Sequence, residues 1–299
     1  MKVFVTGATG YIGGSVAERL MESGHEVTGL ARSEEKATLL KARGIEPVLG
    51  TLDTSEILTK AAQAADAVIH AASADHPGSV VTLVTALERS GKVLIHTTGS
   101  AIVADQADGE YATKLPLTED DYYEPVPSRR SRVDMNRYLR QAAIEKGVRA
   151  IVVCPTMIYG TGRGLQSDSD QIPKLMAISK QVGAGVYFGK GLNHYSNVHI
   201  DDLAALYLLA METAPGGSFF FAENGRSSFK ELAGMISVHL GFGGNIVSVP
   251  VDQVIQQYGE HARLGVASNS YVRAANARRL GWAPTAPSLA EWIKSLPPA

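Results

Sequence analysis

The sequence predicts an α/β protein built on a doubly wound parallel sheet, with a smaller, interleaved C-terminal lobe. Apolar strands alternate with helices through the first half of the 299 residues, and a glycine-rich turn joins the first strand to the first helix. The second half loses this alternation and becomes rich in Gly, Ser and Asp. Right-handed crossovers in the first half predict helices on both faces of the sheet.

The expected strands of the first half are short and apolar. They span Val3–Thr6, Glu26–Leu30, Glu46–Leu49, Asp66–Ala71, Lys92–Thr97 and Arg149–Cys154. The expected helices span Tyr11–Ser23, a segment capped by Ser33 that runs to Ala42, Val80–Ser90 and Ser131–Lys146. This order predicts repeated units of strand, helix and strand.

The second half predicts fewer regular elements. Helices are expected at Ile172–Ser179, Asp201–Glu212, Ser228–Leu240 and Ala290–Leu296, and short strands at Ser218–Phe221 and Ile246–Val249. We expect most of these elements to form the smaller lobe.

The composition is that of an ordinary soluble globular protein, with 45% hydrophobic residues, 19% charged residues and a net charge of −2. This balance predicts neither nucleic-acid binding nor a membrane span. The single cysteine, Cys154, excludes an intramolecular disulfide framework, and with scattered histidines it predicts no metal site. No signal peptide fits before the first strand, so we expect a cytoplasmic protein.

The first turn predicts a dinucleotide site, because residues 3–14 read V-F-V-T-G-A-T-G-Y-I-G-G. Gly7 permits a tight turn, Gly10 lets the backbone approach a phosphate, and Gly13 lets the helix pack on the strand. The helix that begins near Tyr11 then offers free N–H groups and a positive dipole end to a diphosphate. The alternative is a glycine-rich turn that binds nothing.

The segment after the second strand favours NADP(H) over NAD(H). No acidic residue in Val27–Ala31 accepts hydrogen bonds from an adenosine ribose. Arg32 and Ser33 follow, with Lys36 one turn later, and this set suits a 2′-phosphate. A solvated arginine at a helix start is the alternative.

Several motifs together resemble the short-chain dehydrogenase/reductase superfamily, in particular its extended branch of nucleotide-sugar epimerases and dehydratases. They are T-G-A-T-G-Y-I-G-G at 6–14, H-A-A at 70–72, T-T-G-S at 97–100, C-P-T-M-I-Y-G at 154–160 and V-H-I-D-D-L-A at 198–204. The resemblance covers about residues 1–212. It implies a Rossmann fold, Ser100 at the substrate oxygen, and the Pro155–Ile158 turn near the nicotinamide carboxamide.

From this resemblance we expect an NADP-binding Rossmann domain at 1–155 plus about 197–212, and a smaller substrate-binding lobe at about 156–196 and 213–299. The residues expected to contact the cofactor follow the carboxyl ends of the strands. They are Gly7, Thr9, Gly10, Tyr11, Ile12, Gly13, Arg32, Ser33, Lys36, Leu52, Asp53, Ala71, Ala72, Thr98, Pro155, Thr156 and Ile158. For Leu52 and Asp53, a polar turn is an equally good interpretation.

The chain lacks the Tyr-x-x-x-Lys that this superfamily normally carries after the fifth strand. The lysine lowers the pKa of the tyrosine, which then exchanges a proton with the substrate. Counting back from the sixth strand places the motif near Ser128 and Arg132, within S-R-R-S-R. The chain is therefore similar to an atypical subgroup of the superfamily.

Two residues are candidate replacements for the missing acid. Asp75 follows H-A-A-S, and burial would raise its pKa until it donates a proton. Its alternative role is in a turn before His76. Ser128 stands at the expected tyrosine position, although a serine is a poor acid unaided.

Other residues are candidates for lining the substrate pocket, and each has a structural alternative. Arg129, Arg130 and Arg132 suit an anionic substrate or a solvated helix face. The residues expected to contact the substrate are Tyr159, Arg132, His194 and Tyr195.

The leading hypothesis is an NADPH-dependent oxidoreductase that reduces a small carbonyl or related substrate, with Ser100, Ser128 and Asp75 as candidate catalytic residues. A protein that binds NADP but has lost catalysis, serving as a redox sensor or regulator, is the alternative from another class. Epimerisation or dehydration of a nucleotide sugar is a third hypothesis. Helices near 80–90 and 131–146 often form a homodimer in relatives, so a dimer is possible.

Overall fold

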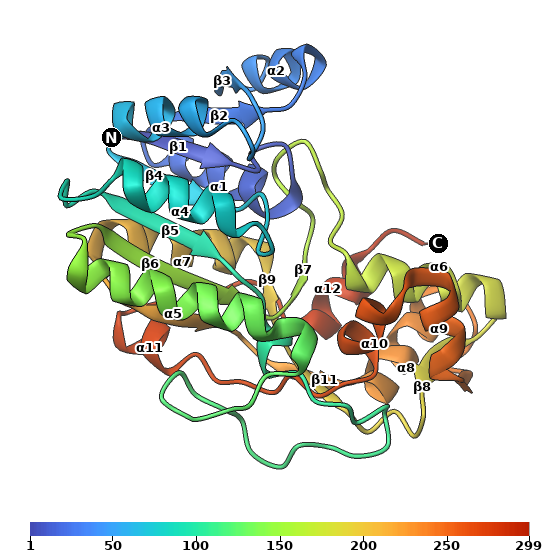
Figure 1. The fold of residues 1–299 in the computed structure, drawn as a ribbon. Coiled ribbons are helices and arrows are strands. Elements are labelled where there is room, and N and C mark those ends of the chain that lie inside the picture. The colour runs from blue at the N-terminus through green and yellow to red at the C-terminus, as the bar shows by residue number, and fades with distance from the viewer. Residues whose placement is uncertain (299) are drawn as a thin grey trace.

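A computed structural model describes residues 1–298 and confirms the predicted fold class. Seven strands form one parallel sheet in the order β10-β6-β5-β4-β1-β2-β3 (Figure 1). They are β1 (Lys2–Thr6), β2 (Glu26–Ala31), β3 (Glu46–Leu49), β4 (Ala67–His70), β5 (Val93–Thr97), β6 (Arg149–Pro155) and β10 (Phe219–Ala222). The order reverses beside β1, which places a crevice at the carboxyl ends of the strands.

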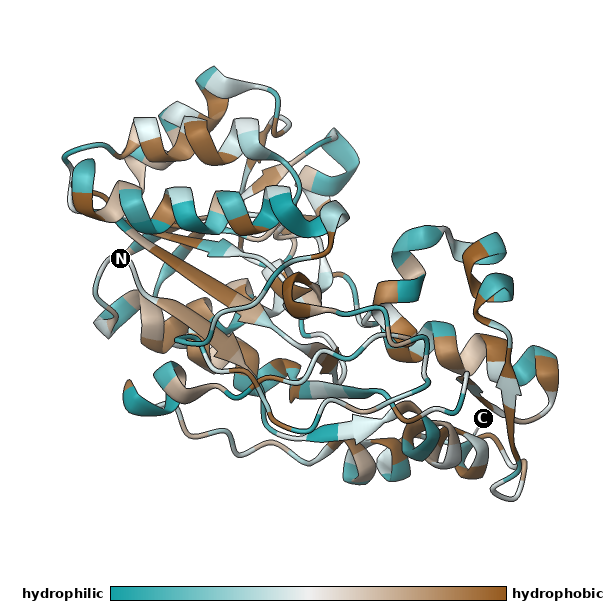
Figure 2. Ribbon diagram, turned by 60° about the horizontal axis from the view of Figure 1, so that its bottom comes forward, coloured by the Kyte–Doolittle hydropathy of each residue, from teal (hydrophilic) through white to brown (hydrophobic). Residues whose placement is uncertain are grey.

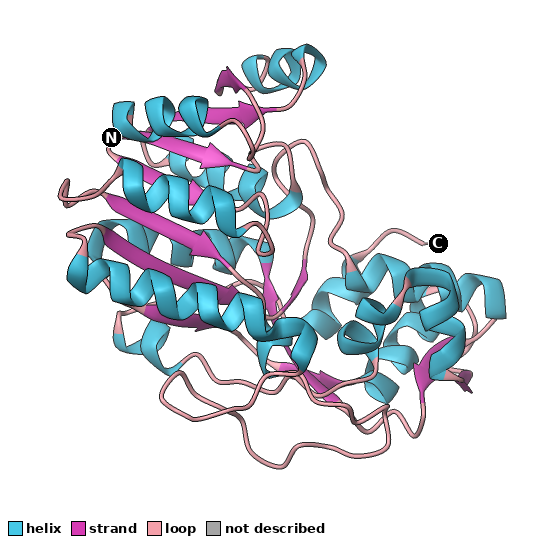
Figure 3. Cartoon of the chain, in the orientation of Figure 1, coloured by secondary structure: helices cyan, strands magenta, loops and turns pink. Residues whose placement is uncertain are grey.

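Helices cover both faces of this sheet, as Figure 3 shows. The helices α3 (Ser55–Ala64), α4 (Pro77–Ala86) and α5 (Arg130–Glu145) lie on one face, and α1 (Tyr11–Glu22) and α7 (Ile200–Thr213) pack together on the other. The helix α2 (Glu34–Lys41) packs near β2 and β3. The side chains between the sheet and these helices are buried and apolar, and the outward helix surfaces are polar (Figure 2).

The smaller lobe has a hydrophobic core of its own, which includes Phe188, Phe229 and Ile236. It contains α6 (Gln171–Val182), β8 (Gly185–Phe188), α8 (Phe229–His239), β12 (Ile246–Val249), α9 (Val251–Tyr258), α10 (Glu260–Val266) and α12 (Leu289–Ser295). A three-stranded sheet of β7 (Met157–Tyr159), β9 (His194–His199) and β11 (Arg226–Ser228) connects the two parts of the molecule.

The expected boundary of the smaller lobe is wrong for two segments within 213–299. The strand β10 extends the large sheet, where Phe219 pairs with Val152 and Phe221 with Cys154. The helix α11 (Ala275–Arg279) and Trp282 then pack on the large core. The run F-F-F-A is buried along its whole length, so it is stable only inside a large sheet.

The short elements were the hardest to predict. The helices α3, α9, α10 and α11 and the strands β7, β8, β9 and β11 have no counterpart among the expected elements. Strands of three or four residues carry too few positions to show a periodicity, and their pairing comes from segments far away in the chain.

Candidate active site

The glycine turn has the geometry of an anion site. Gly7 has φ +80°, and a Cβ on it would lie 2.7 Å from the carbonyl oxygen of Ala71. A Cβ on Gly13 would lie 2.3 Å from the carbonyl oxygen of Gly7. Gly10 caps α1 without any side-chain hydrogen bond, and the first turn of α1 holds no acidic residue. The amino end of this 12-residue helix is therefore exposed to a ligand as backbone alone.

A pocket of about 280 Å³ opens at this helix end. It brings together seven of the residues that we expected to contact the cofactor. They are Gly10, Tyr11, Ile12, Gly13, Ala71, Thr156 and Ile158. Residues 10–13 follow β1, Ala71 follows β4 and Thr156 follows β6, and the sheet register aligns the carboxyl ends of these strands. The backbone cradle fits a dinucleotide diphosphate, because no side chain at Gly10 or Gly13 obstructs it.

Residues 160–171 close one side of this pocket, and the sequence did not predict their position. The Tyr11 hydroxyl donates to the carbonyl oxygen of Gly160 at 2.8 Å, and the Arg163 N–H donates to Ser15 Oγ at 3.0 Å. Gln166 and Asp168 line the pocket from this segment, which runs beside α1 between β7 and α6 (Figure 1). Tyr11 thus anchors a loop through its hydroxyl while its backbone forms the cradle.

The far end of the crevice carries the residues expected at the adenosine. Arg32 directly follows β2, is exposed, and forms no ion pair with an acidic residue anywhere in 1–298. Ser33 accepts the N–H of Lys36 at 3.3 Å and so caps α2 as expected. Asp53 is exposed and lies 3.1 Å from Nε2 of His76, which ties the turn after β3 to the start of α4.

Ser100 lies in a short helical turn after β5 and is only 3% exposed. The hydroxyl of Ser270 lies 2.8 Å from Ser100 Oγ and 2.9 Å from the Ser100 carbonyl oxygen. Tyr195 forms a backbone bridge with Ser270, and its phenol lies near both serines while donating its hydrogen to the carbonyl oxygen of Leu264 at 3.2 Å. Burial raises the pKa of Tyr195 to about 12, so the phenol is protonated at neutral pH.

The sequence did not single out Ser270, because it follows Ser100 by 170 positions and lies in no recognisable motif. The contact is made only when the segment after α10 returns to pair with β9.

Asp75 is not the proton donor that the sequence suggested. Arg132 donates to both of its carboxylate oxygens at 2.5 Å, and this hydrogen bonding lowers the pKa of Asp75. The hydrogen bonds from Arg132 outweigh the rise in pKa that burial causes, so the Asp75 carboxyl is ionised at neutral pH. The pair also lies close to the turn that holds Ser100, because Nη1 of Arg132 is 3.7 Å from the place where a Cβ on Gly99 would stand. Arg132 is thereby neutralised and is no free anion ligand.

Ser128 lies in a short helical turn before α5 and is exposed. Tyr159 is fully buried, and its hydroxyl donates to the carbonyl oxygen of Pro287 at 2.8 Å. The ring also contacts His199 edge-on. Tyr159 is therefore a packing residue of the smaller lobe, and its predicted contact with substrate is wrong.

His194 and Tyr195 begin β9, as neighbours on opposite faces of the strand. His194 is partly exposed and contacts Tyr271 edge-on at 6.2 Å, whereas the Tyr195 ring is buried against Phe229. Only the Tyr195 side therefore faces the hydroxyl cluster around Ser100.

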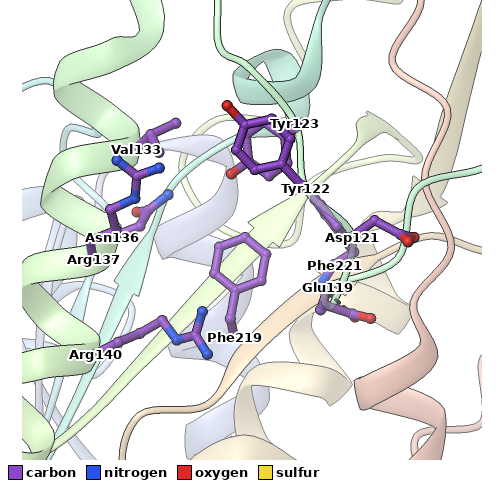
Figure 4. A pocket seen from close by; sticks show the side chains of 10 residues that line it. All are labelled: Glu119, Asp121, Tyr122, Tyr123, Val133, Asn136, Arg137, Arg140, Phe219 and Phe221. Atoms are coloured by element: carbon purple, nitrogen blue, oxygen red, sulfur yellow. Dashed lines mark hydrogen bonds between the residues drawn. The ribbon is translucent and has the colours of Figure 1, made fainter.

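A second cavity, of about 140 Å³, lies between α5 and the edge strand β10 (Figure 4). Asn136, Arg137 and Arg140 line it from the helix, and Phe219 and Phe221 from the strand. None of the expected site residues lines this cavity, so it is separate from the candidate active site.

No helix within residues 1–298 combines the length and the apolar character that a membrane crossing requires.

Comparison with known proteins adds to this geometry. The model of the NAD dependent epimerase/dehydratase family matches residues 3–220. An uncharacterized protein of Schizosaccharomyces pombe is 33% identical, and the match covers 95% of each chain. An oxidase of an Acremonium species is 32% identical over 98% of this chain and 95% of its own length.

A third relative, from Stigmatella aurantiaca, is 29% identical over 75% of this chain and 69% of its own. It is a 4-hydroxy-2-methyl-3-oxo-4-farnesyl-3,4-dihydroquinoline-1-oxide ketoreductase. Among solved structures, the UDP-glucose 4-epimerase of Thermotoga maritima with UDP-glucose has a TM-score of 0.78 at 20% identity, covering 98% of this chain and 96% of that one. This likeness shows a shared fold.

The family match runs from the first strand to the last strand of the large sheet, and the backbone cradle at Gly7–Gly13 lies inside it. The chain belongs to the NAD-dependent epimerase/dehydratase family, within the extended short-chain dehydrogenases/reductases.

Proposed function

We propose that this protein is an NADPH-dependent oxidoreductase that reduces a carbonyl group on a small molecule. One observation carries the proposal: the sheet register aligns the ends of β1, β4, β5 and β6, so the glycine cradle and Ser100 both follow the carboxyl ends of strands in this group. The ketoreductase among the relatives supports carbonyl reduction, and the oxidase among them supports redox chemistry in the opposite direction.

In this proposal, different residues bind the two halves of the cofactor. The N–H groups at the start of α1 would bind the diphosphate, and Arg32 with Ser33 and Lys36 would bind the 2′-phosphate. Residues from Pro155 to Ile158 would lie against the nicotinamide. When bound, the reduced nicotinamide supplies the hydride.

Ser100 would hold the carbonyl oxygen of the substrate by donating its hydroxyl hydrogen. Ser270 keeps the Ser100 hydroxyl in place, and the two serine hydroxyls lie 2.8 Å apart. This chain of hydroxyl groups would deliver the proton that the reduced oxygen needs, in place of the missing tyrosine. Ser128 stays an alternative proton donor, because it stands exposed at the start of α5.

The test uses purified protein with NADPH and a panel of aldehydes, ketones and oxo acids, followed by the loss of NADPH absorbance. Replacing Ser100 with Ala should lower kcat by about 100-fold while the Kd for NADPH stays unchanged, because the hydroxyl acts on the reacting oxygen. An unchanged kcat removes Ser100 from the mechanism.

A redox sensor or regulator that binds NADP without catalysis is the second candidate. The observation in its favour is that Ser128 and Arg132 occupy the positions of the usual tyrosine and lysine, with Arg132 held by Asp75. Tight NADPH binding with no turnover of any carbonyl compound supports this candidate. Epimerisation of a nucleotide sugar is less favoured, because it normally requires that tyrosine.

Cytoplasmic location and a homodimer through α4 and α5 also stay proposals. The only cysteine, Cys154, is free and fully buried, which suits a reducing compartment. Size-exclusion chromatography with light scattering tests the dimer.

A further inference from the structure

Three arginines cluster at the start of α5, and they differ in their partners. Arg130 reaches Glu124 at 3.3 Å, and Arg132 is held by Asp75 through two hydrogen bonds. Arg129 forms no ion pair with any acidic residue of the described chain.

The guanidinium of Arg129 is also poorly satisfied by hydrogen bonds. Its Nε is buried and has no partner within residues 1–298, and Nη1 donates only to the neighbouring Ser128 carbonyl oxygen at 3.3 Å. Burial and the charge of Arg132 lower the pKa of Arg129, yet a guanidinium stays charged at neutral pH. A half-buried cation with an unused donor is costly unless a ligand binds it.

Arg129 stands close to the proposed reacting centre. Arg129 is the cap of α5, one helical turn before Arg132, and Nη1 of Arg132 lies 3.7 Å from the place where a Cβ on Gly99, the neighbour of Ser100, would stand. The first turn of α5 contains no acidic residue, so nothing there competes for the guanidinium.

The charge balance selects the kind of ligand. Arg130 with Glu124 and Arg132 with Asp75 are two neutral pairs, which leaves one positive charge on Arg129. One guanidinium fork matches one carboxylate in both charge and geometry, whereas a phosphate dianion would keep an unpaired charge.

We propose that Arg129 binds a carboxylate on the substrate, so that the preferred substrate is an oxo acid and not a neutral ketone. This inference rests on the proposed carbonyl reduction and names the substrate class of that site. Arg129 acts in it as a specificity-determining residue.

The first experiment compares a 2-oxo acid and a 3-oxo acid with their methyl esters as substrates of the whole protein with NADPH. The wild type should prefer the acids by about tenfold or more in kcat/KM, which is the usual effect of one charge-assisted pair. Arg129→Gln should abolish the preference mainly through KM. Arg129→Lys, which keeps the charge but loses the fork, should restore part of it.

Arg130→Gln is the matched control. It removes the same charge from the neighbouring residue, whose side chain is exposed and paired with Glu124. It should leave the preference for acids intact. If Arg129→Gln fails to fold, as judged by thermal unfolding, the comparison of acid and ester in the wild type and the Arg129→Lys variant still decide the question.

A binding measurement separates this inference from the proposed function. Calorimetry follows the binding of the corresponding saturated acid, which has no carbonyl to reduce, to the protein with NADP⁺ present. Binding by the wild type that Arg129→Gln loses supports the carboxylate site, even if no carbonyl compound is turned over and the reductase proposal fails. Reduction of acids and esters at equal rates, unaffected by Arg129→Gln, overturns the carboxylate site and leaves the reductase proposal standing.

Discussion

The two ends of the crevice are built in different ways. The glycine turn consists of backbone from one short segment, and its shape depends on the absence of side chains at Gly7, Gly10 and Gly13. The centre around Ser100 consists of side chains from distant segments, including Ser270. The difference teaches that the glycine turn depends on close approach of the backbone, whereas the Ser100 centre depends on side chains that only the fold brings together.

The largest expected effect concerns the backbone cradle. In Gly13→Ala, the new Cβ would lie 2.3 Å from the Gly7 carbonyl oxygen and 2.6 Å from its carbon, so the turn must move. We expect a loss of about 3 kcal/mol in the free energy of unfolding, together with loss of NADPH binding. Urea unfolding and calorimetry measure the two effects.

Gly234→Ala in α8 is the matched control for this change. A Cβ there meets nothing within 4 Å, so alanine should stabilise the helix by about 0.5–1 kcal/mol. Equal effects of the two substitutions would contradict the idea that the cradle depends on close approach of the backbone.

A second prediction concerns two buried histidines on β4 and β5, the strands in the middle of the large sheet. His70 on β4 and His96 on β5 are buried with ring centroids 5.3 Å apart. Burial lowers the pKa of His70 from 6.5 to about 4 and that of His96 from 6.5 to about 3. Between these lowered pKa values and 6.5, the histidines of the unfolded chain bind more protons than those of the folded chain. The free energy of unfolding therefore falls as the pH drops below 6.5.

The variant His96→Leu isolates the part of this effect that comes from β5. Neither ring nitrogen of His96 has a hydrogen-bond partner among the described residues, so leucine loses no contact of that kind. Between about pH 6 and pH 4, the free energy of unfolding should fall less steeply with pH in the variant than in the wild type. The slopes should differ by up to about 1.4 kcal/mol per pH unit. Parallel curves of the variant and the wild type in urea unfolding would show that His96 titrates as freely in the folded protein as in the unfolded one.

The third prediction tests the nucleotide end through a side chain. Arg32→Ala should weaken NADPH binding by about tenfold to 100-fold, because one charge-assisted fork to the 2′-phosphate is lost. NADH lacks that phosphate and serves as the internal control in the same titration. Equal weakening of both nucleotides would refute the preference for NADP(H).

The smallest expected effect concerns the ion pair that replaced the expected acid. Asp75 has a lowered pKa, so its pairing with Arg132 stabilises the fold above the unfolded value near 3.8 and is lost as the pH falls through the lower folded value. The pair is partly exposed, so Asp75→Asn should cost only about 0.5–1 kcal/mol at neutral pH. Urea unfolding of Asp75→Asn, Arg132→Gln and the double variant measures the coupling, and a coupling of zero removes the pair from the stability of the fold.

Particular residues show how far the sequence leads. Gly13 and the cap Ser33 were predicted in their observed positions, because Gly13 approaches Gly7 and Ser33 accepts from Lys36, all within six residues along the chain. Asp75 was misjudged, since its partner Arg132 lies 57 positions away and changes the direction of its pKa shift. Tyr159 was misjudged for the same reason, because its hydroxyl bonds to Pro287, 128 positions away.

The sequence by itself determined the parallel sheet, the glycine turn and the absence of the usual tyrosine and lysine, since these are matters of local pattern and residue identity. Only the tertiary structure decided that Ser270 supports Ser100, that β10 belongs to the large sheet, and that Arg129, unlike Arg130 and Arg132, forms no ion pair within the described chain. The physical reason is that hydrogen bonds and ion pairs act over a few ångströms in space, whatever the distance along the chain.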